Sequence, residues 1–492
     1  MKRDQLVTIL ILVAVYLLTV WPLIYYGTPY YASSPDMAYV RAKILEVSHG
    51  NLFTDPISGL INFHPPIYHL FLTPLKLIGL GYQTIFLLVG LFNIAGLIGF
   101  GYLIMRQVYD RASALGVILL LPFTAEYMGS GGILLASSFY FSVPFYLAGL
   151  WLYFSRPELR RARAATAVLW GLAFLISPVY LFLIGLTLVR DIYIRRREGL
   201  FMTAVFLISI FPFYIQAVLV YTNGMGGASA FAFWRGIPDG DWLVGFFREF
   251  LSPARRDIFS VPAMIHAVIL ILFIATALRV RRFFWFIGLL LIAYILTYYH
   301  FDGQYAIRIQ LFLSLFLVGF LIFHGRAEIN YSRWWLAPVL ILMSYGLYLS
   351  HDRNISYFNK EEETYRLYLR SGQHLWTYMD RFLEEDQYIL STQSTYGYFV
   401  MGYSSARALS AYRTLEYFQI PAEISERYHK DYITIMHSED YAEILDITSR
   451  YNINTALFSA NEFDLQIYKV LSLRWEKVYE GPYFIILKNP DA

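Results

Sequence analysis

Residues 164–190 read AATAVLWGLAFLISPVYLFLIGLTLVR, an apolar stretch with arginine-rich sequence on both sides. As a single helix it would cross a bilayer once and leave the two arginine groups on opposite faces, although basic residues favour cytoplasmic loops. A break at Ser177-Pro178, where proline interrupts a helix, gives two short helices over 164–177 and 178–190 that go out and return. Both groups then lie on the cytoplasmic side. The arginines are Arg156, Arg160, Arg161 and Arg163 in the first group, and Arg190, Arg195, Arg196 and Arg197 in the second.

The composition of the whole chain is that of an integral membrane protein. Hydrophobic residues make up 57% of its 492 residues and charged residues only 15%, with a mean hydropathy of +0.47. Soluble domains carry about 25% charge. The chain has no cysteine, which excludes disulfides, thiolate metal sites and a cysteine nucleophile. A net charge of +3 gives no reason to expect a nucleic-acid partner.

With the break at Pro178, the apolar runs predict eleven membrane spans. They are 5–26, 81–106, 112–129, 131–154, 164–177, 178–190, 199–221, 260–279, 283–300, 306–325 and 334–350. The predicted cytoplasmic ends carry 17 of the 25 basic residues in 1–350. This bias predicts a multi-pass protein of the cell membrane with a cytoplasmic N-terminus. Loops 27–65 and 222–258 and the C-terminal part are then extracytoplasmic.

The density of charge changes near residue 350. Residues 1–350 hold 40 charged residues and 351–492 hold 35, a proportion typical of a soluble domain. We therefore predict a polytopic α-helical domain over 1–350 and a soluble α/β domain over 351–492. In the latter, the patterns predict helices over 361–386 and 439–451, strands over 388–392, 396–403 and 453–458, and a terminal hairpin around Gly481-Pro482, with a less regular middle.

The first outer loop is predicted to contain a surface helix over 34–46, with Pro35 in its first turn. Asp36 lies in the same turn, where the helix dipole favours the ionised carboxylate. Apolar residues recur at spacings of three and four, so that one face can lie on the membrane surface. These residues are Met37, Val40, Ile44 and Val47. An acid at the bilayer edge suits a polar acceptor meeting a lipid-borne donor.

Two further elements follow this helix, HGNLFTDP at 49–56 and FHPPIYHLFLTPLKLIG at 63–79. The arrangement of a first span, an outer acid on a surface helix and a His-Pro-Pro element resembles the GT-C superfamily of membrane glycosyltransferases. That superfamily includes protein mannosyltransferases, aminoarabinose transferases and oligosaccharyltransferases. The resemblance implies a sugar donor linked to polyprenyl phosphate or diphosphate, and chemistry at the outer face.

The resemblance also implies roles for individual residues. Asp36 matches the outer acid that activates the acceptor or holds a metal, and His64 and Tyr68 belong to the His-Pro-Pro element. Glu126, in PFTAEYMGSGG, occupies the place of a second outer acid, and Arg308, in GQYAIRIQLFL, matches the arginine that contacts the donor phosphate. A divalent cation, Mg²⁺ or Mn²⁺, is then a candidate cofactor, with Asp36 and Glu126 as ligands.

Loop 222–258 offers a second set of candidates, each with two interpretations. Asp239 and Asp241 form a D-x-D pair that can bind a divalent cation through oxygen, but PDGD is also an ordinary turn sequence. Arg255 and Arg256 can contact a donor phosphate or anionic lipid headgroups.

The sequence departs from the oligosaccharyltransferase pattern. Residues 34–39 read SPDMAY without a D-x-D, and the Trp-Trp pair at 334–335 lies at a predicted membrane edge rather than in the soluble part. We therefore expect an inverting enzyme that transfers a single sugar from a polyprenyl-phosphate donor to a hydroxyl of a glycan, lipid or protein. The alternatives are an oligosaccharyltransferase-like enzyme and a non-catalytic transporter or scaffold. Membrane lipids are expected partners in every case.

Overall fold

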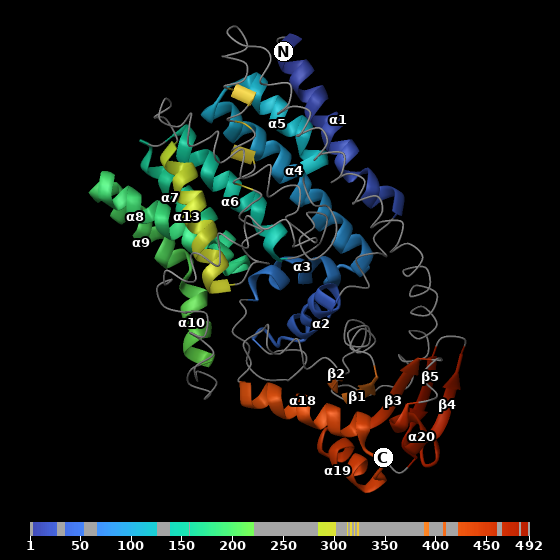
Figure 1. Cartoon of the computed structure of the whole chain (residues 1–492). Coiled ribbons are helices and arrows are strands. Elements are labelled where there is room, and N and C mark those ends of the chain that lie inside the picture. Colours follow the sequence, from blue (N-terminus) through green and yellow to red (C-terminus); the bar gives the residue numbers. More distant parts are fainter. Residues whose placement is uncertain are drawn as a thin grey trace. The chain divides into compact units, whose positions relative to one another are not determined.

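A computed structural model describes eleven continuous segments of the chain and six single positions. The segments are 3–26, 35–53, 66–124, 138–156, 158–220, 284–301, 388–392, 407–409, 422–459, 465–481 and 484–490, and the single positions are 312, 315, 316, 319, 322 and 323. The chain divides into two compact units, one comprising Met1–Tyr25, Leu88–Phe211 and Phe233–Asn359, the other Tyr26–Leu87, Pro212–Ala232 and Lys360–Ala492. Figure 1 shows the helices and strands.

The first unit is helical. Its helices are α1 (Arg3–Tyr26), most of α4 (Tyr82–Val108), α5 (Arg111–Thr124), α6 (Ser138–Ser155), α7 (Arg160–Ile176), α8 (Leu181–Ile194), α9 (Arg196–Ser209) and α13 (Phe284–Phe301). Among the described residues, one helix is long enough and apolar enough to cross a membrane, namely Thr84–Val108. Asp4–Val20 and Trp285–Thr297 are shorter apolar helices. The eleven spans, the domain bounds and the orientation stay predictions.

The break predicted at Ser177-Pro178 is confirmed. Helix α7 ends at Ile176, a 3-10 turn η2 covers Pro178–Tyr180, and α8 begins at Leu181. The start of α7 and the end of α8 lie together, because Arg163 and Asp191 form an ion pair of 3.1 Å. Arg195 also pairs with Glu158 at 3.3 Å. The two helices are therefore an antiparallel hairpin with both arginine groups at its open end.

The Arg163–Asp191 pair is buried in the helical unit. Each side chain is only 3% exposed. The Tyr153 hydroxyl of α6 donates to the other Asp191 oxygen at 3.0 Å, so both carboxylate oxygens have a partner. Removing two charges from water is costly and requires such complete pairing. The network thus joins α6, α7 and α8 at one end.

The hairpin packs on an aromatic face of α6. Phe139, Tyr146 and Tyr153 are seven residues apart, so they lie on one side of this helix. Tyr146 stacks between Tyr180 of η2, at 4.8 Å, and Trp170 of α7, at 6.1 Å between ring centroids. The aromatic contacts and the ion pair together fix both ends of the hairpin.

One predicted span is interrupted. The stretch 199–221 forms two helices, α9 ending at Ser209 and α10 (Phe211–Val220) beginning after Ile210. Pro212 explains the break, because proline fits the first turn of a helix and not its interior.

The second unit contains a five-stranded sheet in the order β2-β1-β3-β5-β4. Its strands are β1 (Tyr388–Ser391), β2 (Arg407–Ala408), β3 (Ile453–Ser459), β4 (Glu476–Glu480) and β5 (Phe484–Lys488). Strand β1 pairs in parallel with β2 and β3, whereas β5 pairs antiparallel with both β3 and β4. The predicted strands 388–392 and 453–458 and the terminal hairpin are therefore confirmed.

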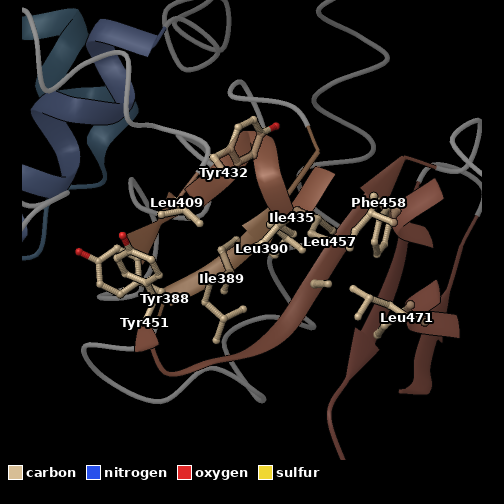
Figure 2. Close-up of a cluster of buried hydrophobic side chains, with 14 of the residues drawn as sticks. Tyr388, Ile389, Leu390, Leu409, Tyr432, Ile435, Tyr451, Leu457, Phe458 and Leu471 are labelled. Carbon is tan, nitrogen blue, oxygen red and sulfur yellow. The ribbon is translucent and has the colours of Figure 1, made fainter. Parts of the chain in front are cut away.

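Three helices, α18 (Ala422–His437), α19 (Tyr441–Arg450) and α20 (Gln466–Ser472), complete this part of the unit. Its apolar core, in Figure 2, joins Ile389 and Leu390 of β1 with Ile435 of α18 and Leu457 of β3. Burial and the Asp431 carboxylate raise the pKa of Tyr451, whose hydroxyl donates to Asp431 at 2.6 Å.

The predicted irregular middle of this domain is wrong in one part. Residues 422–437 form the continuous helix α18. Its sequence contains the charged run His429-Lys430-Asp431, but Tyr428, Tyr432 and Ile435 recur at spacings of four and three and are buried, so the helical pattern is present in the sequence. Tyr432 helps to position α18 against the sheet, because the Tyr432 hydroxyl donates to the Thr392 carbonyl at the end of β1, at 2.8 Å. The predicted helix 361–386 and strand 396–403 lie outside the described residues.

We predict that Gly199→Ala destabilises the helical unit. A Cβ at Gly199 would lie 2.4 Å from the Ile192 nitrogen and 2.6 Å from the Asp191 carbonyl oxygen, both backbone atoms. Overpacking of this kind costs about 1–3 kcal/mol. Gly185→Ala, on the neighbouring helix α8, is the control: its Cβ would meet nothing within 4 Å. We expect a lower thermal unfolding midpoint for Gly199→Ala in detergent and an unchanged or higher one for Gly185→Ala. Equal midpoints would contradict the close α8–α9 packing.

We also predict that Arg163→Met lowers the free energy of unfolding by about 3–5 kcal/mol, because it leaves Asp191 as a buried charge without this partner. The double variant Arg163→Met/Asp191→Leu should recover most of the loss. Thermal unfolding of the wild type and the three variants, including Asp191→Leu, measures the coupling. Additive losses would show that the pair is not coupled.

Candidate active site

The predicted catalytic acid lies on a helix of the second unit. Helix α2 covers Pro35–Ser48, which confirms the predicted helix over 34–46, and Asp36 is its second residue. The Asp36 side chain lies outside the described part of the structure. The other predicted residues, except Tyr68, lie entirely outside it. They are His64, Glu126, Asp239, Asp241, Arg255, Arg256 and Arg308.

Helix α2, which was predicted to lie on the membrane surface, is more deeply buried than its sequence pattern indicates. Val40, Ile44 and Val47 are buried, as an apolar face requires, but Arg41 and Lys43 are buried as well. Arg41 is fully inaccessible and Lys43 is 1% exposed. The prediction that the apolar face lies on the membrane surface is therefore wrong over 40–47, because protein covers this face. Protein also covers the charged side of α2.

Arg41 lies over aromatic rings at the start of α4. Its Cζ is 5.5 Å from the centroid of Tyr82 and 5.4 Å from that of Phe86. The Nζ of Lys76, at the end of α3 (Ile67–Leu77), lies 4.6 Å from the same Tyr82 ring. A guanidinium or ammonium over an aromatic face is stabilised most when water is excluded. Tyr82 thus connects α2 with α3.

The His-Pro-Pro element leads directly into α3, where Tyr68 is fully buried and His69 is 2% exposed. Their rings meet edge to face, with 5.2 Å between centroids. Burial raises the pKa of Tyr68, so its phenol stays protonated near neutral pH. The structure therefore gives Tyr68 a buried packing position in α3, and its contact with donor or acceptor stays a prediction.

Lys43 lies on the same helix as Asp36, the predicted catalytic acid. Residues seven apart lie on the same side of a helix, so position 43 follows position 36 two turns later, about 10 Å along the axis. Glu46 is nearby on α2 and accepts a hydrogen bond of 2.8 Å from Asn51 in the turn that ends the helix. Helix α2 therefore combines an acid at its start with buried cations behind it.

Sequence reasoning missed Arg41, Lys43 and His69. A signal existed in the charges, because YVRAKILEVS places a basic residue on either side of the apolar stripe. Only the packing of α3 and α4 shows that these side chains are covered.

No group of three or more potential metal-ligating side chains occurs among the residues whose side chains the structure describes. The proposed carboxylate ligands are all outside that set, so the divalent cation stays a prediction.

Comparison of the sequence with known proteins identifies no relative. No family profile matches the chain, and no curated protein sequence matches it significantly.

The fold is informative. The apo structure of ArnT from Cupriavidus metallidurans has a TM-score of 0.56 and 13% identity over 96% of this chain and 97% of its own. The oligosaccharyltransferase of Archaeoglobus fulgidus in complex with Zn and sulfate has a TM-score of 0.55 and 10% identity over 92% and 68%. Both are GT-C proteins. This chain has the GT-C fold.

A further oligosaccharyltransferase structure with the same fold, AglB from A. fulgidus, holds an inhibitory peptide and a dolichol-phosphate. Its TM-score is 0.52, with 11% identity over 94% of this chain and 70% of that one. The GT-C resemblance inferred from the first outer loop is therefore confirmed for the fold. The match spans nearly all of ArnT but less than three quarters of the oligosaccharyltransferase chains.

We predict that Tyr82→Leu destabilises the packing of α2 and α3, since it removes the ring beneath both Arg41 and Lys76. The expected loss is about 1–2 kcal/mol for partly desolvated cation–π contacts. Tyr82→Phe retains the ring and is the matched control. Limited proteolysis of the folded protein should cut the Tyr82→Leu variant faster near residues 35–80. Equal cleavage of both variants would contradict a role for the ring.

Proposed function

We propose that the chain is an inverting glycosyltransferase that transfers one sugar from a polyprenyl-phosphate carrier to an acceptor hydroxyl at the outer face of a membrane. The observation that carries this proposal is the GT-C fold shared with ArnT and AglB, together with Asp36 in the first turn of α2. In this proposal the protein is a multi-pass membrane protein, with the 351–492 domain on the extracytoplasmic side.

The chemistry requires a base and a cation near the leaving phosphate. Asp36 would accept the proton of the acceptor hydroxyl while the oxygen of that hydroxyl forms the bond to the anomeric carbon. The bond between that carbon and the phosphate oxygen breaks at the same centre, which inverts its configuration. Polyprenyl phosphate leaves with the bonding electrons, and arginines would stabilise its developing charge. Arg308 is the first candidate, with Arg255 or Arg256, while His64 and Glu126 would orient the substrates.

The contacts of two described residues, Phe312 and Phe316, support the position proposed for Arg308. Phe312 packs on Tyr180 in η2, at 6.1 Å, and on Tyr146, at 5.1 Å. Phe316 packs on Phe286 near the start of α13, at 5.0 Å, and the adjacent Trp285 contacts Tyr153 at the open end of the hairpin. A helix over 306–325 would therefore run from the closed end of the hairpin toward its arginine-rich end. Arg308, one turn before Phe312, would lie beyond the closed end, away from both arginine groups.

An oligosaccharyltransferase-like activity is the second candidate, because AglB shares the fold at a similar TM-score. The greater coverage of ArnT and the absence of a D-x-D in residues 34–39 favour a single sugar.

We predict that Asp36→Asn reduces sugar transfer by roughly 10²–10⁴-fold, the usual contribution of a general base. The purified full chain in nanodiscs would be incubated with radiolabelled polyprenyl-phosphate sugars and membrane extract, and donor loss and label transfer measured. Asp446→Asn, which changes a carboxylate that is 73% exposed in the other part of the unit, is the control. Equal transfer by wild type and Asp36→Asn would contradict the assigned base.

The same assay separates the alternatives. Transfer of a lipid-linked oligosaccharide to an asparagine peptide, with no transfer of single sugars, would favour the second candidate. Turnover of neither donor class would favour a non-catalytic transporter or scaffold. Loss of transfer with a chelator, and recovery with Mg²⁺ or Mn²⁺, would show that transfer requires a divalent cation and would favour the alternative role of Asp36 as a metal ligand.

A further inference from the structure

The open end of the α7–α8 hairpin carries a large excess of positive charge. Residues 156–198 contain eight arginines and three acids. Two of the acids are engaged in the pairs already described, Asp191 with Arg163 and Glu158 with Arg195. Most of the guanidinium groups there are therefore not neutralised by carboxylates of this segment.

Two of these arginines are held by aromatic rings. Arg190 lies over Trp285 of α13, with its Cζ 3.3 Å from the ring centroid, and it donates to the Tyr153 hydroxyl at 3.4 Å. Arg160 lies over Phe201 of α9 at 4.2 Å. Neither has a carboxylate partner within the described part of the chain. Stacking uses the face of the guanidinium and leaves N–H groups at its edge, in the geometry that binds a phosphate.

The positions of these two arginines are fixed by the packing beneath them. Arg160 is one turn before Arg163 on α7, and Arg190 adjoins Asp191 on α8, so the two flank the buried ion pair. Gly199 brings the start of α9, and with it Phe201, against the Asp191 backbone. The two arginines are thus prepared for a ligand before it arrives.

Large apolar side chains are exposed among the arginines. Tyr193 is 90% exposed, and Leu159, Ile194 and Leu200 are each more than half exposed. A free anion would gain nothing from these side chains. A molecule with a phosphate and an acyl chain can contact both, and arginines beside apolar residues are typical of segments that recognise anionic lipids.

We propose that Arg160 and Arg190, held on Phe201 and Trp285, form a binding site for anionic phospholipid headgroups. The phosphate accepts hydrogen bonds from the two guanidinium groups, and the acyl chains lie along the exposed apolar residues of α7–α9. This site is at the opposite end of the hairpin from η2, and it does not depend on the proposed transferase activity.

Lipid binding to the full chain in detergent micelles tests the proposal. We expect saturable binding of a fluorescent phosphatidylglycerol and at least about tenfold weaker binding of the matching phosphatidylcholine. Arg160→Gln/Arg190→Gln should weaken phosphatidylglycerol binding by roughly thirtyfold, given the usual contribution of an arginine near an anionic surface. Arg196→Gln/Arg197→Gln is the matched control, with the same loss of charge at two exposed neighbours that have no aromatic partner within the described residues.

Equal weakening by the two double variants would overturn the proposal in favour of a diffuse basic surface. Equal binding of the two lipids by the wild type would overturn it as well. Trp285→Leu and Phe201→Leu provide a second test, because they keep every charge and remove only the rings. We expect each to weaken phosphatidylglycerol binding about three- to tenfold, and unchanged binding in both would contradict the role of the rings.

Discussion

The buried ion pair between Arg163 and Asp191 constrains the arrangement of the described helices around it. Two charges can be held away from water only where geometry and hydrogen bonding are complete, and Tyr153 supplies the remaining bond. Because the pair joins the start of α7 to the end of α8, these helices must run antiparallel with the Pro178 break between them. The positions of α6, of α9 through Gly199 and of α13 through Trp285 all follow from this corner.

The two ends of the hairpin differ in chemistry as a result. The closed end is aromatic, with Tyr180 packed against Phe139 and Phe312. The open end is cationic and exposes apolar side chains. In the orientation predicted from the sequence, the arginine-rich end faces the cytoplasmic leaflet.

Helix α2 raises the same issue of buried charge in the other unit. A helix with Arg41 and Lys43 would be expected to expose them, yet both are buried, and Arg41 lies over Tyr82 and Phe86 at the start of α4. Aromatic rings stabilise a cation less than water does, so the burial of a cation needs a precise arrangement of the surrounding helices. A rigid α2 would suit the catalytic role proposed for Asp36, since small displacements of a general base lower the reaction rate.

The sequence by itself determined the local elements: the break at Pro178, the helix that carries Asp36, and the strands of the terminal hairpin, because proline, capping residues and apolar period act over a few positions. The arginine clusters even predicted that the two ends of the hairpin meet. Only the tertiary structure decided that Asp191 would neutralise Arg163, that Trp285 would hold Arg190, and that Arg41 would be buried, because each partner is distant in the chain. Helix α18 belongs to this second class, since its position depends on a tyrosine bonded to the end of β1. Burial of a charge depends on what surrounds it, and no periodicity within one segment encodes that.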